Sequence, residues 1–218
     1  MTGAAPTDEI APVRAGVPAP AVPGPVPRLL PWLLTLGGAL GLLSAFTLTV
    51  ERIEILLDPA YRPSCSINPV LSCGSVMVTE QAAVFGFPNP LLGIGAFAVV
   101  LTTGVALLAG ARFPLWYWGG LLAGAAAGVL FVHYLIVASL YEIGALCPYC
   151  MVVWAVTIPI FWYVALAVLH LVAERSGGPA RRGYGLLARY HAVAVVLWFV
   201  VVAGLALHRF WDYWSTLV

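Results

Sequence analysis

The sequence is poor in charge and contains no lysine at all. Only 9% of its 218 residues are charged, whereas 62% are hydrophobic, and the mean hydropathy is +0.98. A water-soluble globule of this length needs more polar residues to cover its surface, so that class of protein is excluded. The formal net charge of +1 gives no reason to expect a nucleic acid partner. The composition therefore indicates an integral membrane protein.

The first 28 residues lack a long apolar run and are rich in proline and small residues. Such a composition can neither nucleate a helix nor assemble a core, so we expect a disordered tail over residues 1–28. A cleaved signal peptide would place a short apolar segment just after a basic start. Here the apolar run begins late and is of spanning length, so we expect the first span to be retained.

Five apolar stretches are present, and a bilayer core about 30 Å thick needs roughly 20 apolar helical residues. They predict an all-α integral membrane protein. The expected spans run from Leu29 to Leu57, Leu91 to Gly110, Leu115 to Tyr141, Pro148 to Val172, and His191 to Phe210.

Two of these spans contain unusual residues. Glu51, Arg52 and Glu54 lie in the last turns of the first span, where they are tolerated if those turns emerge among the lipid headgroups. The third span contains a run of small residues, which we expect to serve close helix packing. Its glycines are Gly119, Gly120, Gly124 and Gly128.

The arginines predict the orientation, because short loops that keep arginine tend to stay in the cytoplasm. One side of the chain has Arg14, Arg28, Arg112, Arg175, Arg181, Arg182 and Arg189, and the other has only Arg52, Arg62 and Arg209. We therefore expect a plasma membrane protein with a cytoplasmic N-terminus, a basic cytoplasmic loop over 174–190, and an extracytoplasmic C-terminus. The fifth helix and a short outer tail occupy 191–218.

The outer link over 58–90 is the longest connection between spans. Prolines at 59, 63 and 69 keep its first half irregular, whereas the stretch from Ser72 to Phe85 lacks proline and predicts a short helix with Ser72 as its N-cap. A helix of that length cannot span the bilayer. We expect it to cover the outer ends of the spans.

The four cysteines form two pairs, Cys65 with Cys73 in the outer link and Cys147 with Cys150 at the start of the fourth span. Both pairs therefore lie on the same outer side, where disulfides persist. In Cys147-Pro148-Tyr149-Cys150 the sulfurs share one helix face, and the positive end of the helix dipole favours the thiolate. Cys65 lies on the more mobile part of the link, where we expect a partner to reach it. Two such pairs suggest electron transfer by disulfide exchange.

Three other uses of the cysteines are possible. Two structural disulfides are ordinary in exported proteins, although a bridge within a CxxC closes only a tiny loop and stabilises little. A zinc site would need all four thiolates to converge tetrahedrally. A non-catalytic thiol-metal relay would be expected to contain many other soft ligands, and nothing else in this sequence is rich in them. We expect redox exchange and no resident metal.

Four segments together resemble one protein family. They are Cys65-Ser66-Ile67-Asn68-Pro69, Cys73-Gly74-Ser75-Val76-Met77, Phe85-Gly86-Phe87-Pro88-Asn89 with Gly93, and Cys147-Pro148-Tyr149-Cys150. In this order they resemble the bacterial branch of the vitamin K epoxide reductase family, over roughly Leu29 to Val172. The resemblance implies a four-helix transmembrane bundle over 29–173 that holds a quinone, either menaquinone or ubiquinone, near its outer end. The fifth helix is then an appended element.

The resemblance also implies roles for the cysteines. Cys150 is similar to the sulfur that meets the quinone, and Cys147 to the one that is attacked from the loop. Cys73 is similar to the attacking loop cysteine, and Cys65 to the one that exchanges with a protein substrate. Some bacterial members carry a fused thioredoxin-like domain. Because this sequence stops at Val218, we expect a separate thioredoxin-fold partner of the DsbA type.

Four further residues are candidates for quinone binding. By the same resemblance, Asn89 and Thr79 match a hydrogen-bonding asparagine and a small hydroxyl residue, although Asn89 could instead cap the second span. Trp154 stands where animal relatives have a tyrosine. His133 is an ionisable group in the middle of the third span, which makes it a functional candidate, with a neutral hydrogen-bonded histidine as the alternative.

The expected activity is a membrane thiol oxidoreductase that reoxidises this partner and supports disulfide formation in exported proteins. Vitamin K epoxide or quinone reduction proper is the alternative within the same family. An unrelated oxidase of the DsbB type would share the chemistry, but it would place the CxxC in the first outer loop.

Overall fold

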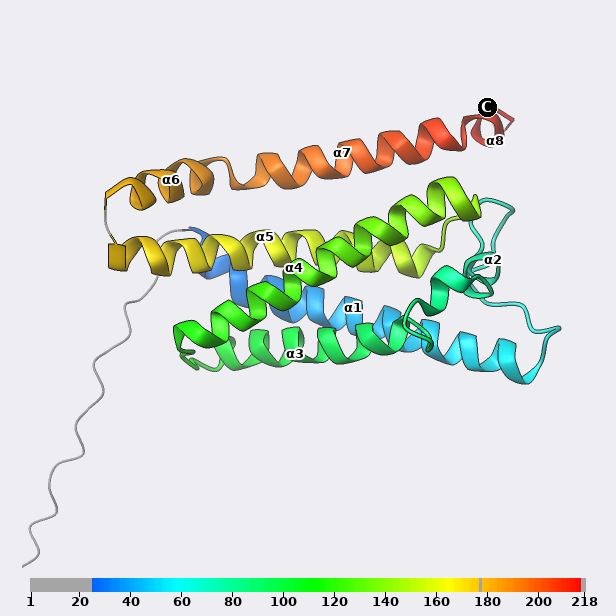
Figure 1. Cartoon of the computed structure of the whole chain (residues 1–218), viewed down its shortest axis with the longest axis horizontal. Coiled ribbons are helices and arrows are strands. Elements are labelled where there is room, and N and C mark those ends of the chain that lie inside the picture. Colours follow the sequence, from blue (N-terminus) through cyan, green and yellow to red (C-terminus); the bar gives the residue numbers. More distant parts are fainter. Residues whose placement is uncertain (1–24, 177, 217–218) are drawn as a thin grey trace, which may run out of the picture.

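The computed structural model describes residues 25–176 and 178–216, and these are helical over most of their length (Figure 1). Five helices are long and apolar enough to cross a membrane, which confirms the predicted number of spans and the all-α class. They are α1 (Pro25–Leu57), α3 (Pro90–Leu108), α4 (Leu115–Val137), α5 (Pro148–Ser176) and α7 (His191–Arg209). The third spanning stretch continues through the π-helix η2 (Ala138–Ile143).

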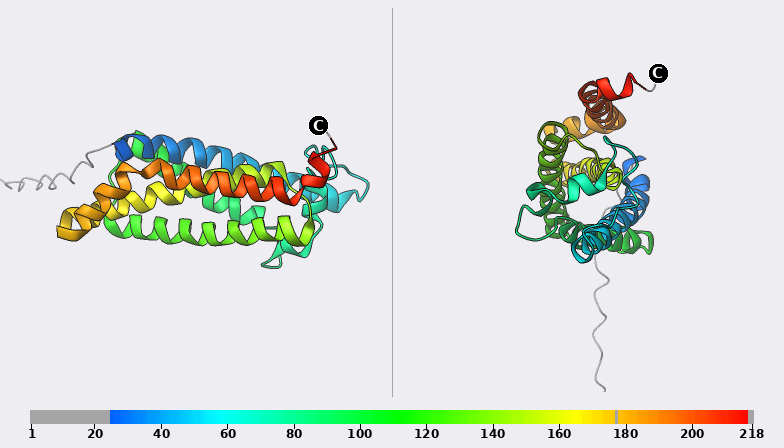
Figure 2. Two further views of the ribbon diagram at one scale, coloured as in Figure 1. Left: turned by 90° about the horizontal axis from the view of Figure 1, so that it is seen from above. Right: turned by 90° about the vertical axis from the view of Figure 1, so that its right-hand side faces the viewer.

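Helices α1, α3, α4 and α5 form an elongated bundle, and α7 lies along one side of it (Figures 1 and 2). The closest approach in the bundle is between α1 and α3, where glycines remove the side chains that would collide. A Cβ at Gly38 would come 2.6 Å from the backbone nitrogen of Leu101, and one at Gly104 would overlap the backbone of Thr35. These two positions, and not the glycines of α4, provide the close helix packing.

The interior of the bundle has two cores, which we call the inner core, near the start of α1, and the outer core, at the end that contains the cysteines. Residues from α1, α3, α4 and α5 fill the inner core, among them Leu34, Phe97, Trp118 and Val164. The outer core joins α4, α5, the outer link and the end of α7 through Val70, Leu140, Leu146, Trp154 and Phe210. The end of α7 is therefore part of the structure that surrounds the cysteines.

The outer link contains two short helices, α2 (Cys73–Met77) and the 3-10 helix η1 (Glu80–Ala83), in place of the single helix predicted from Ser72 to Phe85. Ser72 is the N-cap as predicted, since its side chain accepts a hydrogen bond from the backbone nitrogen of Ser75. The helix ends early because the backbone of Thr79 is extended, with φ −79° and ψ 157°, and the Thr79 hydroxyl donates to the carbonyl of Val76. Beyond this break, the Asn89 side chain accepts from the nitrogen of Val84 and donates to the carbonyl of Gln81.

The ends of the chain differ from the prediction in two places. Residues 1–24 of the predicted tail lie outside the described residues, and α1 already begins at Pro25. The connection predicted as a basic loop over 174–190 is largely the helix α6 (Gly178–Arg189). Its apolar and basic residues are segregated on opposite faces, and a loop prediction from charge alone misses that pattern. Beyond α7, the short helix α8 (Trp211–Trp214) ends the described structure.

Candidate redox site

A short parallel bridge between Leu71 and Leu146 brings the two cysteine pairs together. The backbone nitrogen of Ser72 donates to the carbonyl of Leu146 over 2.9 Å, and that of Leu146 donates to the carbonyl of Val70 over 2.7 Å. Cys73 begins α2 just after one side of this bridge, and Cys147 directly precedes α5 on the other side. Residues that are distant in sequence are thereby held side by side.

The sulfur atoms are arranged for exchange between the pairs. Cys65 and Cys73 form a disulfide, whereas Cys147 and Cys150 are free thiols. The sulfur of Cys147 lies 3.0 Å from that of Cys73, so a mixed disulfide between them requires little movement. The sulfurs of Cys65, Cys73 and Cys147 all lie within 4.8 Å of one another. Because two of them are already bonded, they are not available together as thiolate ligands for a metal in this state.

The prediction that Cys65 is open to a partner is not met in this state. Cys65 is 5% exposed, and Cys73 and Cys147 are fully buried. They pack with Leu48 and Met77 in a small apolar cluster. An external thiol can reach Cys65 only after the link has moved.

The environment of Cys147 favours its thiolate. A hydrogen bond from the Cys150 thiol lowers the pKa of Cys147 below the ordinary value, and the backbone N–H groups of Cys150 and Tyr149 act in the same direction. Burial and the negative charge of Glu51 oppose this shift without reversing it. Proline at the next position, Pro148, opens α5 and leaves the N–H groups of its first turn directed at this sulfur.

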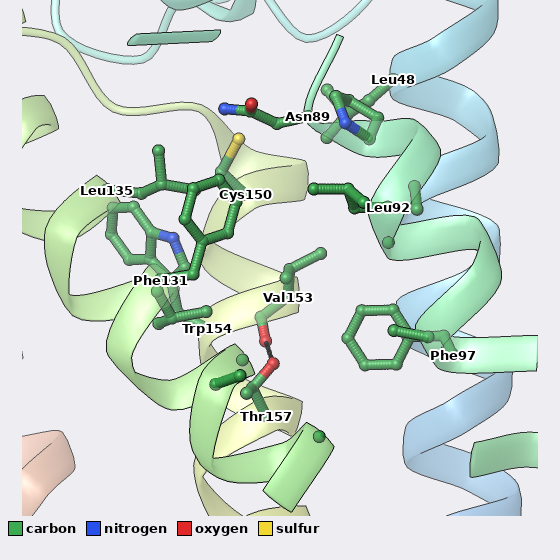
Figure 3. Close-up of a pocket in the computed structure, with 18 of the residues that line it drawn as sticks. Leu48, Asn89, Leu92, Phe97, Phe131, Leu135, Cys150, Val153, Trp154 and Thr157 are labelled. Atoms are coloured by element: carbon green, nitrogen blue, oxygen red, sulfur yellow. Dashed lines mark hydrogen bonds between the residues drawn. The ribbon is translucent and has the colours of Figure 1, made fainter. Parts of the chain in front are cut away.

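Beneath the cysteines lies a cavity of about 730 Å³, within the range of small-molecule sites (Figure 3). Cys150 contributes to its wall, together with apolar residues of α1, α3, α4, α5 and the outer link. Gly120, Gly124 and Gly128 of α4 also line it. A Cβ at Gly120 or Gly124 would meet nothing within 4 Å, so these glycines leave open space instead of packing a neighbouring helix.

Few polar groups face this cavity, and one of them has no partner. The indole nitrogen of Trp154 is buried and makes no hydrogen bond within the described residues. Asn89 also lines the cavity, with its side-chain oxygen and nitrogen each bonded to the outer link. It makes no side-chain capping bond to α3, so capping is not its role here. Figure 3 shows Asn89, Cys150 and Trp154 around the same space.

The structure does not bring every predicted residue to the cavity. Thr79 donates from its hydroxyl to the carbonyl of Val76 and is not part of the wall. His133 also lies outside the wall. It accepts a hydrogen bond of 2.9 Å from the indole nitrogen of Trp198 on α7, and its Nδ1 is 2.8 Å from the carbonyl of Val129. This geometry matches the alternative of a hydrogen-bonded structural histidine.

Two residues near the site were not among the predicted site residues. Arg52 and Gln81 line the cavity, and Gln81 also donates to the carboxylate of Glu142 over 2.8 Å. The signal for Arg52 was a charged cluster inside an apolar span, which we interpreted as a membrane-surface feature. No local pattern distinguishes Gln81 from an ordinary exposed residue of the link.

The family model described as the vitamin K epoxide reductase family matches residues 32–165. The chain belongs to this family. The match covers more than half of the chain, from α1 into α5, and includes all four cysteines. No curated protein matches the chain. Membership in the vitamin K epoxide reductase family makes the protein a multi-pass membrane oxidoreductase with thiol chemistry, and members of this family use quinones and generally act with thioredoxin-like partners.

The size and the apolar wall of the cavity suit a quinone. A quinone is a flat ring with carbonyl acceptors and an apolar tail, so it needs an apolar chamber with a few hydrogen-bond donors. The cavity offers this environment, and the unpartnered N–H of Trp154 is a donor without an acceptor. A buried donor left unpaired costs about 1–3 kcal/mol, which a carbonyl acceptor would offset.

Proposed function

We propose that this protein is a membrane thiol oxidase that takes electrons from a dithiol protein and passes them to a quinone, and so supports disulfide formation in exported proteins. The observation that carries the proposal is the 3.0 Å approach of Cys73 to Cys147, with Cys150 in the wall of the adjoining cavity. The proposed partner is a separate thioredoxin-fold protein of the DsbA type.

Each transfer is a thiol–disulfide exchange. The partner's thiolate attacks Cys65, the Cys65–Cys73 bond breaks, and Cys73 leaves as a thiolate. The partner's second thiol then displaces Cys65 and leaves the partner with a disulfide. Next, Cys73 attacks Cys147 of an oxidised Cys147–Cys150 pair, and Cys150 leaves as a thiolate. Attack by Cys65 on Cys73 releases Cys147 and restores the Cys65–Cys73 disulfide.

In the proposed cycle, a state with an oxidised Cys65–Cys73 pair and a reduced Cys147–Cys150 pair follows these exchanges, and this arrangement of disulfide and free thiols supports the proposal. A quinone, when bound, accepts two electrons and two protons. Cys150 is the residue from which the electrons leave the protein, and Trp154 and Asn89 are the proposed hydrogen-bonding residues for the ring.

The proposed orientation places the cysteines outside the cytoplasm. Arg52, Arg62 and Arg209 are the arginines at the cysteine end, whereas the cytoplasmic end has the more basic connection around α6. The proposed location is the plasma membrane, with the N-terminus in the cytoplasm and the C-terminus outside. Labelling of single-cysteine variants in intact cells tests this orientation.

The test of the function combines purified protein, a quinone and a reduced DsbA-like protein, and follows quinol formation by absorbance. We expect quinol and oxidised partner to form in equal amounts, with replacement of any one cysteine by serine stopping turnover. Tight stoichiometric binding of a soft metal without any change in quinone absorbance would instead support a thiol-metal relay.

A further inference from the structure

Glu51 is a buried carboxylate that the proposed transfer steps do not use. It lies in the outer part of α1 and is 5% exposed. A carboxylate at such a site is costly unless its oxygens are hydrogen-bonded. They are bonded here, and every donor belongs to the outer link. Tyr61 donates from its hydroxyl over 3.0 Å, and Ser64 donates from both its hydroxyl and its backbone nitrogen.

These donors lie in the segment that leads to Cys65. We call residues 58–65 the Cys65 arm, which leaves the end of α1 and precedes α2 at the same end of the bundle (Figure 1). The other hydrogen bonds that residues 58–64 make within the described structure are local, between residues at most four positions apart. Apart from the local bond between the backbone nitrogen of Asp58 and the carbonyl of Glu54, the bonds from Tyr61 and Ser64 to Glu51 are therefore the ones that join this segment to α1 within the described structure.

The hydrogen bonds to Glu51 also hold the neighbouring Cys65–Cys73 disulfide in place. Ser64 is adjacent to Cys65, so holding Ser64 against α1 keeps Cys65 in its buried position. It also keeps the Cys65–Cys73 disulfide against Cys147. The bond to Glu51 raises the pKa of Tyr61, so its hydroxyl keeps its proton and remains a donor.

We propose that Glu51 is a positioning residue that holds the Cys65 arm closed for exchange with Cys147 and must release it before an external thiol can attack Cys65. The inference rests on the proposed function, because it assigns the two exchanges of that function to two positions of one segment. With the arm closed, electrons pass between Cys73 and Cys147. With the arm open, the dithiol of a thioredoxin-fold protein reaches Cys65, and Cys73 leaves as a thiolate.

If the Cys65 arm has a closed and an open position, weakening its bonds to Glu51 should change two rates in opposite directions: reduction of the Cys65–Cys73 disulfide by an external thiol, and transfer between Cys73 and Cys147. Weakening the bonds to Glu51 raises the rate at which dithiothreitol reduces the Cys65–Cys73 disulfide, because the open position becomes more populated. It lowers the rate of transfer from Cys73 to Cys147, because the closed position becomes less populated. One or two lost hydrogen bonds correspond to a change of about three- to tenfold in each rate.

The variants are Glu51→Gln, Tyr61→Phe and Ser64→Ala. The matched control is Glu54→Gln, since Glu54 is one turn away on α1 and its carboxylate makes no hydrogen bond within the described residues. Dithiothreitol reduction is measured on purified protein without quinone or partner, by alkylation and mass analysis of the peptides with Cys65 and Cys73. Exchange between the two pairs is measured before any reductant is added, as the Cys73–Cys147 link that forms when the Cys147 thiolate attacks Cys73 and Cys65 leaves as a thiolate. Thermal unfolding is followed in parallel.

We expect all three variants to show faster external reduction and slower transfer than Glu54→Gln, at temperatures well below unfolding. Equal external reduction rates in the three variants and the control would overturn the proposal, as would a fall of both rates together. Failure of the wild-type protein to reduce a quinone would count against the proposed function only, because the dithiothreitol measurement does not involve quinone.

Discussion

The two cysteine pairs are held in the protein in very different ways. Cys147 directly precedes α5, a helix of 29 residues packed within the bundle, and Cys150 lies in the first turn of this helix, so helix geometry determines how the two residues are placed. Cys65 and Cys73 lie in a link made of short helices and irregular backbone. Side-chain hydrogen bonds and one backbone bridge determine the position of that pair.

The difference matches what a relay requires of each pair. A sulfur that faces a cavity inside the bundle must stay at a fixed distance from whatever binds there, and a long helix provides that. A sulfur that meets a separate protein must become accessible, and a link held by a few replaceable bonds can open. The two pairs approach each other most closely where the sulfur of Cys73 lies 3.0 Å from that of Cys147.

The largest effect is expected from removing one cysteine of the Cys147–Cys150 pair. Replacing Cys150 with serine removes the sulfur in the cavity wall, so we expect quinol formation to be abolished. Cys147 then has no partner of its own, so its thiolate attacks Cys73 of the Cys65–Cys73 disulfide and Cys65 leaves as a thiolate. The Cys73–Cys147 link should accumulate, which a shift on a non-reducing gel detects. Full quinone reduction by Cys150→Ser would end the proposed scheme.

A smaller effect is expected from a substitution in the wall of the cavity beside Cys150. Trp154→Phe removes the unpartnered indole N–H, and the loss of one hydrogen bond raises the KM for quinone by about three- to tenfold. Reduction of the Cys65–Cys73 disulfide by dithiothreitol should not change. Steady-state kinetics with varied quinone measures the first quantity.

The control for this substitution is Trp214→Phe, because Trp214 also has a buried indole nitrogen that makes no hydrogen bond to residues 25–176 or 178–216, but it does not line the cavity. We expect its KM for quinone to match that of the wild type. An equal rise in both variants would mean that the indole nitrogen of Trp154 does not bind the ring.

The pH dependence of the exchange between Cys73 and Cys147 can also be measured. The hydrogen bond from Cys150 lowers the pKa of Cys147, so the Cys147 thiolate persists at a lower pH and is lost as the pH falls through that lowered pKa. In Cys150→Ser a hydroxyl can still donate this bond, whereas in Cys150→Ala none remains. Formation of the Cys73–Cys147 link should therefore require a higher pH in Cys150→Ala. Coincident pH profiles would show that Cys150 does not tune Cys147.

The smallest effect is expected far from both pairs. His133→Gln replaces a side chain bonded to Trp198 outside the cavity, so the KM for quinone should stay within about twofold of the wild type, as for most substitutions away from a site. A loss of quinone affinity as large as that of Trp154→Phe would return His133 to the list of quinone ligands.

Much of the fold was predictable because the pattern that encodes it is local. Apolar stretches of spanning length determine the five helices, and Ser72 caps α2 as its residue type predicts. The single helix predicted from Ser72 to Phe85 was wrong because the backbone becomes extended at Thr79, whose hydroxyl donates to the carbonyl of Val76. The helix α6 was missed because the arginines suggested a loop.

The site was predictable in its cysteines but not in its surroundings. Spacing and topology place the CxxC at a helix start and the two pairs at one end of the bundle. The glycines of α4 look the same in sequence whether they pack a helix or line a cavity, and only the positions of the neighbouring helices distinguish the two. The burial of Cys65 likewise depends on residues brought from α1, α2 and α5.

The sequence by itself determined the number of spans, the pairing of cysteines into two sets, and the family, because each is written in composition, spacing or short motifs. Only the tertiary structure decided that Cys73 lies beside Cys147, that Trp154 faces the cavity without a partner, and that Glu51 holds the arm before Cys65. These depend on distances between helices that are far apart along the chain, and packing of the whole bundle sets those distances.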